Sequence, residues 1–423
     1  MSVVTADPRQ RSVECPAEVR ARLGPSRRPI AAGRRVTLLA VHHVEVDGQT
    51  LTGGAEKYIC MTAKALVEAG ASVHIGYSGS SIYRDMLQEI SPDQLTVERT
   101  GWLDSSLAGD SRIRLATIRQ RRRWLRATNA DTVLAIQQAG GAAFAASLLA
   151  AKTLGLRVVS SIRQMPGDVS PPTSKRWLGV IPSPQLWRRR LLWRRRLPAW
   201  CCDALIFNCR RAAEAFAQEW GSARHRFHVI YNGEPSRHEE QHFSREGPRR
   251  IATVGRVTEA KGADTLLAAF SFIAQKHRYC RLAYYGDGPL IPALKDKARR
   301  LGLSDRIDFA GYQKDHKRIY DDIDIYVQIS RREALANSVI EAMSRGIPCV
   351  VSDVGGLPET VIDGESGLVI PKDDPQACAD TLLRLMADRA AYHRLSSAAA
   401  ERARRMFDLA EFQRRTVETV LGI

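Results

Sequence analysis

Short apolar runs alternate with longer segments of helical periodicity along most of the chain. In the first half the runs predict strands at 35–41, 72–77, 132–136, 157–162, 204–208 and 227–231, and the periodic segments predict helices at 55–69 and 142–154. In the second half they predict strands at 251–254, 281–285, 306–309, 324–328, 348–352 and 367–370, with helices between them. Strands that alternate with helices in this way are typical of parallel sheets with helices on both faces. We therefore expect an α/β protein built from two doubly wound halves.

A polar stretch at 233–249 lacks apolar periodicity and separates the two halves. We expect a flexible polar leader at 1–33, a Rossmann-like N-terminal domain at 34–232, this stretch as the linker, and a Rossmann-like C-terminal domain at 250–406. A final helix at 407–423 can cross back to the N-terminal domain. Ligands of doubly wound sheets bind outside the carboxyl ends of the strands, so the expected site is a cleft between the domains.

The chain has 423 residues, 44% of them hydrophobic and 26% charged, which excludes a peptide-sized module and a disordered chain. Its formal net charge of +17 favours an anionic partner: nucleic acid, an acidic membrane surface or a phosphorylated small molecule. The eight cysteines lack the spacing of zinc ligands, which indicates buried thiols in a reducing compartment. We find no secretory leader and no apolar run long enough for a bilayer, so we expect a cytoplasmic protein.

Two glycine-containing turns follow the first two strands of the second half. Gly255-Arg256 and Lys261-Gly262 place a guanidinium and an ammonium at the edge of the sheet, where a diphosphate could accept charge-assisted hydrogen bonds. The alternative is a basic turn that is merely exposed to solvent. Gly286 begins the second turn, Gly-Asp-Gly-Pro, which by itself indicates only a tight turn.

Glu333 and Glu341 give the most specific signal, because they flank the start of a helix that follows the predicted strand at 324–328. Two carboxylates in this strand-turn-helix context can accept hydrogen bonds from sugar hydroxyls. The free backbone N–H groups of Leu335, Ala336 and Asn337 could meet phosphate or hydroxyl oxygens.

Together with the segment 352–359 (Ser-Asp-Val-Gly-Gly-Leu-Pro-Glu), these motifs resemble, in order and spacing, the donor half of the GT-B retaining glycosyltransferases of family 4. In the first half, Gly53 and Gly54 resemble that family's glycine-rich loop. Tyr231-Asn232-Gly233 is similar to the start of its hinge. The resemblance implies a GT-B fold, with an acceptor domain followed by a nucleotide-sugar domain.

The resemblance also implies a role for each motif residue. Arg256 and Lys261 would hold the diphosphate of a nucleotide sugar, Glu341 the ribose hydroxyls, and Glu333 would lie near the transferred sugar. Further donor contacts would come from Gly255, Gly286, Leu335, Ala336 and Asn337, and a sugar or acceptor pocket from Gly53, Gly54 and Arg163. No Asp-x-Asp pair ends a strand at a suitable place, so we expect no obligatory metal and no cofactor besides the nucleotide sugar.

Three residues depart from the family pattern. Ala334 and Ala336 stand where the family usually has glycines, which restricts the backbone and could tighten the sugar pocket or displace the loop. Arg163 follows the predicted strand at 157–162, where the family often has a histidine. With Asn337 it is similar to a subset that acts on N-acetylhexosamine or galactose donors in surface-polysaccharide assembly. Arg163 could equally bind an acidic sugar or an acceptor phosphate.

Two segments rich in Arg and Trp, 119–126 and 187–196, carry much of the basic excess. This composition is typical of an interfacial helix on anionic lipid, and the alternative is a sheet-covering helix with a solvated basic face. Phosphate contacts to nucleic acid would use the same arginines, but no nucleic-acid motif is present, so we expect no nucleic-acid partner.

The prediction is therefore a cytoplasmic retaining glycosyltransferase, for hexose or N-acetylhexosamine, peripheral on the inner face of the cytoplasmic membrane. Its partners would be a nucleotide sugar and a glycan or polyprenyl-linked acceptor in polysaccharide, lipopolysaccharide or glycolipid biosynthesis. Two alternatives stay open: a catalytically inactive glycosyltransferase-like binding protein, and a basic nucleic-acid-binding protein.

Overall fold

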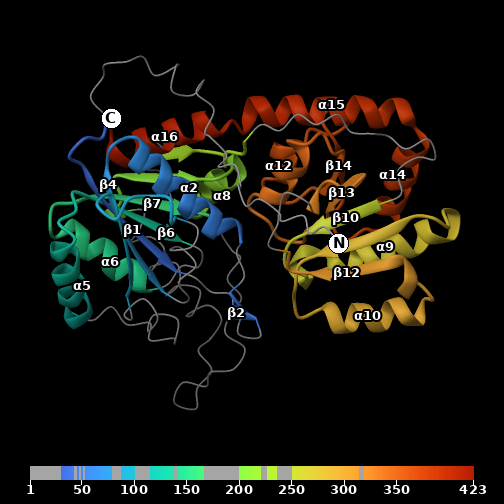
Figure 1. Cartoon of the computed structure of the whole chain (residues 1–423), viewed down its shortest axis with the longest axis horizontal. Helices are drawn as coiled ribbons and strands as arrows, with labels where there is room; N and C mark the ends of the chain where they lie inside the picture. Colours follow the sequence, from blue (N-terminus) through green and yellow to red (C-terminus); the bar gives the residue numbers. More distant parts are fainter. Residues whose placement is uncertain are drawn as a thin grey trace, which may run out of the picture.

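The computed structural model shows two α/β domains side by side, each built on a parallel sheet (Figure 1). The structure describes residues 30–41, 45–46, 49–50, 53–78, 87–100, 115–137, 142–165, 200–220, 226–235, 250–313 and 319–423. Two Rossmann-like domains of this kind confirm the predicted GT-B fold class.

The N-terminal sheet has seven parallel strands in the order β5-β4-β1-β6-β7-β8-β9. Their bounds are β1 Arg35–Val41, β4 Ser72–Ser78, β5 Leu95–Arg99, β6 Thr132–Gln137, β7 Arg157–Ile162, β8 Ala204–Phe207 and β9 Phe227–Val229. A short antiparallel hairpin pairs β2 (Glu45–Val46) with β3 (Gln49–Thr50). The apolar pattern missed β5, because at the sheet edge only its Leu95 is buried.

Helices cover both faces of this sheet. One face packs against α2 (Gly54–Glu68) and α16 (Leu409–Leu421), the last helix of the chain, which supplies Phe412 and Val420 to the core. The other face packs against α5 (Leu115–Ala127), α6 (Ala142–Lys152) and α8 (Arg210–Trp220). The C-terminal helix therefore completes the N-terminal domain.

The C-terminal sheet has six strands in the order β12-β11-β10-β13-β14-β15. Their bounds are β10 Arg250–Val254, β11 Arg281–Tyr285, β12 Ile307–Gly311, β13 Ile325–Gln328, β14 Cys349–Ser352 and β15 Leu368–Ile370. One face carries α9 (Ala263–Lys276), α10 (Ile291–Arg300) and α14 (Pro375–Ala387), and the other α12 (Asn337–Met343), α13 (Leu357–Thr360) and the second half of α15 (Arg389–Met406).

The strand order places a topological switch point in the second sheet. The chain runs from β10 outward to β11 and β12, then returns to the other side of β10 as β13. Ligands of open α/β sheets bind at such a reversal, outside the carboxyl ends of the strands. The turns after β10 and β13 therefore lie where a ligand is expected, and these turns carry the motifs singled out in the sequence.

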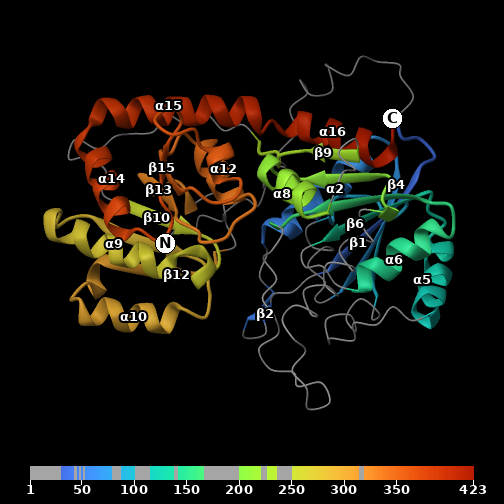
Figure 2. The ribbon, with the colours of Figure 1, turned by 180° about the vertical axis from the view of Figure 1, so that it is seen from behind.

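The chain crosses between the domains at two adjacent places. The Glu234 N–H donates to the Phe407 carbonyl over 2.8 Å, at the break between α15 and α16. A Cβ on Gly233 would lie 2.8 Å from the Cα of Leu409, so only glycine allows this approach. Figure 2 shows α15 and α16 following one another across the two domains. Of the predicted linker, 236–249 lie outside the described residues.

Seven of the eight cysteines fall within the described ranges, and each is a free thiol. Six are buried and Cys201 is half-buried; burial raises the pKa of Cys209 and Cys280 to about 12, so both thiols stay protonated at neutral pH. Within these ranges, none of the helices combines the length and the apolar character that a bilayer crossing requires.

Candidate functional site

The turns after β10 and β11 pack backbone against backbone. Gly255 and Gly286 both adopt positive φ, at 139° and 136°. A Cβ on Gly286 would lie 2.1 Å from the Gly255 carbonyl oxygen, and one on Gly288 would lie 2.2 Å from that of Val257. No side chain fits at such distances, so glycine at these places shapes the turn that carries Arg256.

The switch point brings Lys261 and Glu333 together. Lys261 ends the short 3-10 helix η2 (Glu259–Lys261) after β10, and its Nζ forms an ion pair with Glu333, which follows β13. Ser330 Oγ also contacts this carboxylate, at 3.4 Å. Arg256 is exposed, and within the described ranges its guanidinium has no recorded hydrogen bond or ion pair. The site therefore contains one paired cation and one that is open to an anion.

Arg331, which the sequence analysis did not single out, anchors the loop before Glu333. Its guanidinium donates to both carboxylate oxygens of Asp264, at 2.7 and 2.9 Å, and it forms an ion pair with Asp373. Its own N–H donates to the Ala260 carbonyl. The hydrogen bond from Arg331 lowers the pKa of Asp264, so this pair stays charged and holds the two turns together.

Ala334 and Ala336 fit this loop without backbone strain. Among the described non-glycine residues only Asn129 and Asp373 have positive φ, so neither alanine needs glycine. The close approach is made from the opposite side: a Cβ on Gly355 would lie 1.7 Å from the Glu333 carbonyl oxygen, and one on Gly356 2.3 Å from that of Ala334. The glycine requirement of this packing therefore falls on the segment 352–359.

Ala336 is the N-cap residue of α12, whose first residue is Asn337. In the part of the chain that the structure describes, no hydrogen bond is recorded from the N–H groups of Leu335, Ala336 or Asn337. These donors remain free, as expected at a helix start. The side chains of Leu335 and Ala336 are buried and can offer only their backbone.

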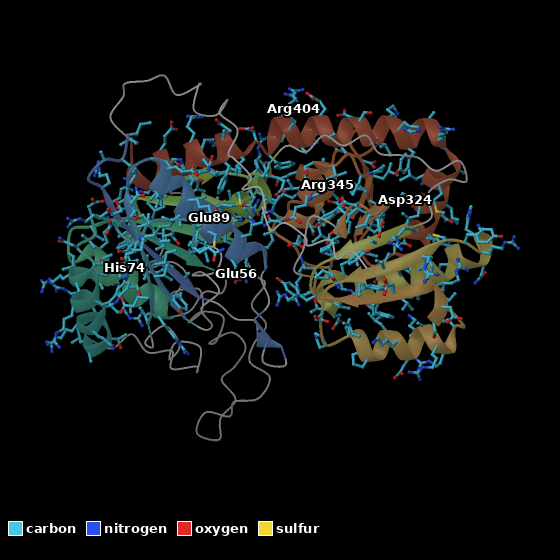
Figure 3. The ribbon with its side chains drawn as sticks, viewed as in Figure 1. Glu56, His74, Glu89, Asp324, Arg345 and Arg404 are labelled. Atoms are coloured by element: carbon cyan, nitrogen blue, oxygen red, sulfur yellow. The ribbon has the colours of Figure 1, made fainter. Side chains whose placement is uncertain are left out.

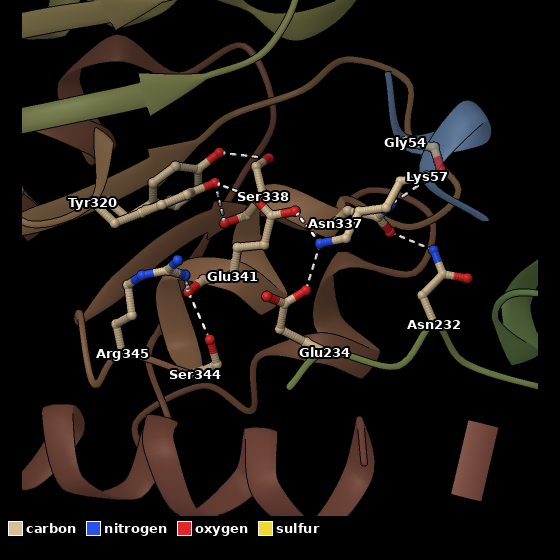
Figure 4. Close-up of polar contacts among 11 residues, drawn as sticks. Gly54, Lys57, Asn232, Glu234, Tyr320, Asn337, Ser338, Glu341, Ser344 and Arg345 are labelled. Carbon is tan, nitrogen blue, oxygen red and sulfur yellow. Dashed lines mark hydrogen bonds and ion pairs between the residues drawn. The ribbon is translucent and has the colours of Figure 1, made fainter. Parts of the chain in front are cut away.

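Glu341 lies one turn further along α12 and contacts the other domain (Figure 4). Lys57 Nζ, from α2, donates to Glu341 Oε1 over 2.7 Å and to Glu234 Oε2 over 2.5 Å. The Tyr320 hydroxyl donates to Glu341 Oε2 over 2.8 Å. The sequence analysis missed Lys57, Glu234 and Tyr320; the only signal was the position of Lys57 three residues after Gly54.

The charges of this cluster shift the pKa of Glu234 and that of Lys57. Burial raises the pKa of Glu234, the neighbouring Glu341 raises it further, and Lys57 opposes both. Burial lowers the pKa of Lys57, but the charges of Glu341 and Glu234 outweigh burial and hold it above its ordinary value. Lys57 is therefore charged at neutral pH.

A chain of side chains also joins the domains at Asn337. Its Nδ2 donates to the Gly54 carbonyl over 3.2 Å, and its Oδ1 accepts from Asn232. Asn232 Oδ1 accepts in turn from Arg163 Nη2, and the Arg163 guanidinium lies over the Tyr58 ring, 3.8 Å from its centroid. A Cβ on Gly54 would come within 2.9 Å of Asn337 Nδ2, so glycine keeps this approach open.

Arg163 is half-buried, and no carboxylate within the described ranges is recorded as its partner. Burial lowers the pKa of its guanidinium, and its Nη1 has no hydrogen-bond partner among the described residues. A partly desolvated guanidinium with an unused N–H donor marks a place where an anionic group would be stabilised. Gly53 is the N-cap of α2, and its N–H donates to the buried Glu56 over 2.8 Å. Figure 3 labels Glu56 at the start of this helix.

Glu359, the last residue of the segment 352–359, holds the domains together at a second place. Its carboxylate accepts from the N–H groups of Arg210 and Arg211, both at 2.7 Å, at the start of α8. It also accepts from the Tyr231 hydroxyl over 2.7 Å. On the surface beside it, Arg211 forms an ion pair with Asp353 at 2.8 Å.

The basic segment 119–126 belongs to α5. Trp124 turns inward, where its Nε1 donates to Glu98 over 3.1 Å, and Arg121 is buried against Ser147. Within 119–126 the exposed side chains are Arg119, Gln120, Arg123 and Arg126, so this part of α5 covers the sheet with a basic outer face. Residues 187–196 lie outside the described residues. Over the ranges that are described, no group of three or more His, Cys, Asp or Glu could hold a metal ion.

Two family models match consecutive parts of the chain. The model described as Glycosyltransferase Family 4 matches residues 52–234, and the one described as Glycosyl transferases group 1 matches residues 236–402. The first model ends at the domain crossing and the second covers the sheet that carries Lys261, Glu333 and Glu341.

Curated relatives are similar over part of their length. Mannosylfructose-phosphate synthase of Agrobacterium fabrum is 29% identical over 49% of this chain and 50% of the relative. The Vi polysaccharide biosynthesis protein VipC/TviE of Salmonella typhi is 32% identical over 36% of this chain and 28% of the relative. The chain thus spans half or less of these relatives. HepE from Anabaena, solved with UDP-glucose, shares the fold with a TM-score of 0.69 at 18% identity, over 92% of this chain and 100% of HepE.

Proposed function

Because the chain belongs to the group 1 and family 4 glycosyltransferases, we propose that it transfers a sugar from a nucleotide diphosphate sugar to a glycan or lipid-linked acceptor in polysaccharide biosynthesis. The observation that carries the proposal is the arrangement at the C-terminal switch point. The segments that follow β10 and β13 carry the exposed Arg256, the Lys261–Glu333 ion pair and Glu341.

The donor would lie across these residues. Arg256 and Lys261 would neutralise the diphosphate, and the free N–H groups at the start of α12 would add hydrogen bonds. Glu341 would accept hydrogen bonds from the ribose hydroxyls. HepE, which shares this fold, was solved with UDP-glucose, which makes a uridine nucleotide a first donor to test.

Transfer would break the bond between the sugar anomeric carbon and the diphosphate, and form a bond from the same carbon to an acceptor hydroxyl oxygen. The acceptor proton would leave with the diphosphate. Lys261 would move from Glu333 to the departing phosphate and stabilise its charge, while Glu333 would favour the positive charge on the sugar. We propose retention of the anomeric configuration, with hexose or N-acetylhexosamine as the transferred group and no metal in the step.

The acceptor would approach from the N-terminal domain, through Gly53, Gly54 and Arg163. A membrane-held acceptor would suit the basic outer face of α5, and Trp200 is 88% exposed at the border of the undescribed basic segment. Vesicles with anionic phosphatidylglycerol should retain the protein more than neutral phosphatidylcholine vesicles do. Equal retention would reject docking on the inner face of the membrane.

A panel of nucleotide sugars tests the function directly. The purified protein should gain thermal stability with at least one donor and slowly hydrolyse or transfer its sugar. At a donor concentration near the wild-type KM, Glu341→Ala and Lys261→Ala should each lower turnover strongly without unfolding the protein, whereas Lys276→Ala, on the exposed end of α9, should not. Full activity of both Glu341→Ala and Lys261→Ala would contradict the proposed donor site. Donor binding by the wild type without turnover would favour an inactive binding protein.

A further inference from the structure

Lys57 joins three segments that are distant in sequence. It lies on α2 of the N-terminal domain, Glu234 lies at the domain crossing, and Glu341 lies on α12 of the C-terminal domain (Figure 4). Side-chain exposure is 31% for Lys57, 8% for Glu234 and 13% for Glu341. The contact is thus largely shielded from water, where a charge-assisted hydrogen bond is stronger than at the surface.

Two carboxylates share Lys57, because its ammonium donates to both Glu234 and Glu341. The Tyr320 hydroxyl also donates to Glu341, and the charge of Arg345 lowers the pKa of Glu234 as Lys57 does. Arg345 donates to the Glu341 backbone carbonyl over 2.7 Å and lies over the Tyr320 ring. Without Lys57, these two largely buried carboxylates would lose the donor that they share and repel each other, which favours protonation of one of them.

We propose that Lys57 is a positioning residue of the donor site, which keeps Glu341 ionised and oriented for the nucleoside and thereby makes donor binding depend on the N-terminal domain. The proposal rests on the role of Glu341 in the proposed function. Nothing in the family matches or the relatives assigns a role to this lysine.

The geometry of Glu341 supports positioning rather than simple attachment of the domains. Lys57 donates to one of its oxygens and Tyr320 to the other, so the carboxylate plane is held from both sides. A ligand group held in this way loses less freedom when the nucleoside binds.

Replacing Lys57 by methionine tests the proposal. The probes are inorganic pyrophosphate, which lacks a ribose, and the nucleoside diphosphate among UDP, GDP and ADP that binds the wild type most tightly. The dissociation constant of the nucleoside diphosphate should rise about 10-fold at pH 7, by the size of one charge-assisted hydrogen bond, while that of pyrophosphate should not change. Lys64→Met, on the same helix and paired only loosely with Glu89 at 3.6 Å, is the matched control and should bind both probes as the wild type does.

A second variant separates positioning from a structural role. In Lys57→Met/Glu234→Gln the competing carboxylate is gone, so Glu341 should ionise again and affinity should return to within about 3-fold of the wild type. If Lys57 only tied the domains together, removing a second partner would not restore binding.

Three outcomes would overturn the proposal. Wild-type affinity in Lys57→Met, an equal loss for both probes, or no recovery in the double variant would each do so. Glu341→Gln distinguishes failure of the role of Lys57 from failure of the proposed donor site. If it weakens nucleotide binding while Lys57→Met does not, only the role of Lys57 fails; if it binds as the wild type does, the proposed donor site fails as well.

Discussion

The two carboxylates of the Glu333–Glu341 motif are held in different ways. In the proposed donor site, Lys261 and Glu333 form the end that would hold the sugar, called the sugar end, and their ion pair is made within the C-terminal domain. The end that would hold the nucleoside, called the nucleoside end, consists of Lys57, Glu234 and Glu341, and its cation comes from the other domain. One end is therefore independent of how the domains are placed, and the other exists only when they face each other as they do here.

The surroundings reinforce this difference. Backbone contacts that only glycine allows, at Gly262 and Gly355, lock the turns of the sugar end. The nucleoside end has long side chains at its centre, and these can separate without disturbing either core. A ligand that binds both ends would therefore depend on the domain arrangement only at the nucleoside end. Variants of the sugar end should affect transfer, and variants of the nucleoside end should affect nucleotide binding.

The largest expected effect is at the sugar end. Lys261→Met should lower the transfer rate by roughly 100-fold or more, because it removes a preorganised cation from the departing diphosphate. Small-angle scattering should show the wild-type domain arrangement, since the lost pair lies within one domain. Lys276→Met is the control, and a rate within 3-fold of the wild type for Lys261→Met would contradict this role.

Gly355→Ala should break the backbone packing of the sugar end. The new Cβ would lie 1.7 Å from the Glu333 carbonyl oxygen, and the φ of +54° is already unfavourable for alanine. We expect a loss of roughly 3 kcal/mol in the free energy of unfolding, from steric overlap and backbone strain together. Gly364→Ala has a similar φ of +71° but open space around its Cβ, so its smaller loss isolates the strain. Equal losses by chemical denaturation would refute the packing argument.

Arg163→Met tests whether the N-terminal domain also contributes to transfer through a residue outside the nucleoside end. Its guanidinium reaches Asn337 only through Asn232, so nucleoside diphosphate affinity should stay within about 3-fold. Transfer should fall roughly 10-fold if the guanidinium stabilises an anionic group of the sugar or the acceptor. Comparing uronic acid donors with neutral donors, and phosphate-bearing with phosphate-free acceptors, identifies the source. If transfer is unchanged with every combination of donor and acceptor, Arg163 has only a structural role.

Arg211→Ala removes an interdomain ion pair that is exposed, unlike that of Lys57. Side-chain exposures of 44% for Arg211 and 59% for Asp353 limit its contribution to about 0–1 kcal/mol. Nucleotide affinity and transfer should change less than 2-fold. A change as large as that expected for Lys57→Met would show that any interdomain pair matters, and the distinction between buried and exposed pairs would fail.

The smallest effect is a pH dependence at the sugar end. The hydrogen bond from Arg331 lowers the pKa of Asp264 below its ordinary value of 3.8. A lowered pKa in the folded state stabilises the protein above pH 3.8, and this stabilisation is lost as the pH falls through the folded pKa. The difference in unfolding temperature between wild type and Asp264→Asn should therefore be present at pH 5 and shrink toward pH 3. A difference that is constant with pH would rule out this contribution.

The central strands could be predicted from sequence because buried parallel strands form continuous apolar runs. The bounds of β1, β7 and β11 agree with the prediction, and most others differ by one or two residues. The errors occur where burial is partial. β5 lies at an edge, the short β2–β3 hairpin has no apolar run, and the predicted strand 227–231 ends at Val229 because Ile230 and Tyr231 lead into the domain crossing.

The sugar end could be predicted for a similar reason. Lys261 and Glu333 each follow a strand, and the strand order alone brings them to one switch point. The nucleoside end could not, because Lys57 and Glu341 are separated by 284 residues and meet only through the placement of two domains. Ala334 and Ala336 show the same limit, since their fit depends on Gly355 and Gly356 from another loop.

Steady-state kinetics of the wild type and Glu341→Gln on the best donor of the nucleotide-sugar panel test the central claim most directly. The wild type should turn over at least one donor, and Glu341→Gln should raise the KM for that donor about 10-fold with a smaller change in kcat, because the lost contact is to the ribose and not to the reacting sugar. A wild type that turns over no donor, or a Glu341→Gln variant with an unchanged KM, would contradict the account.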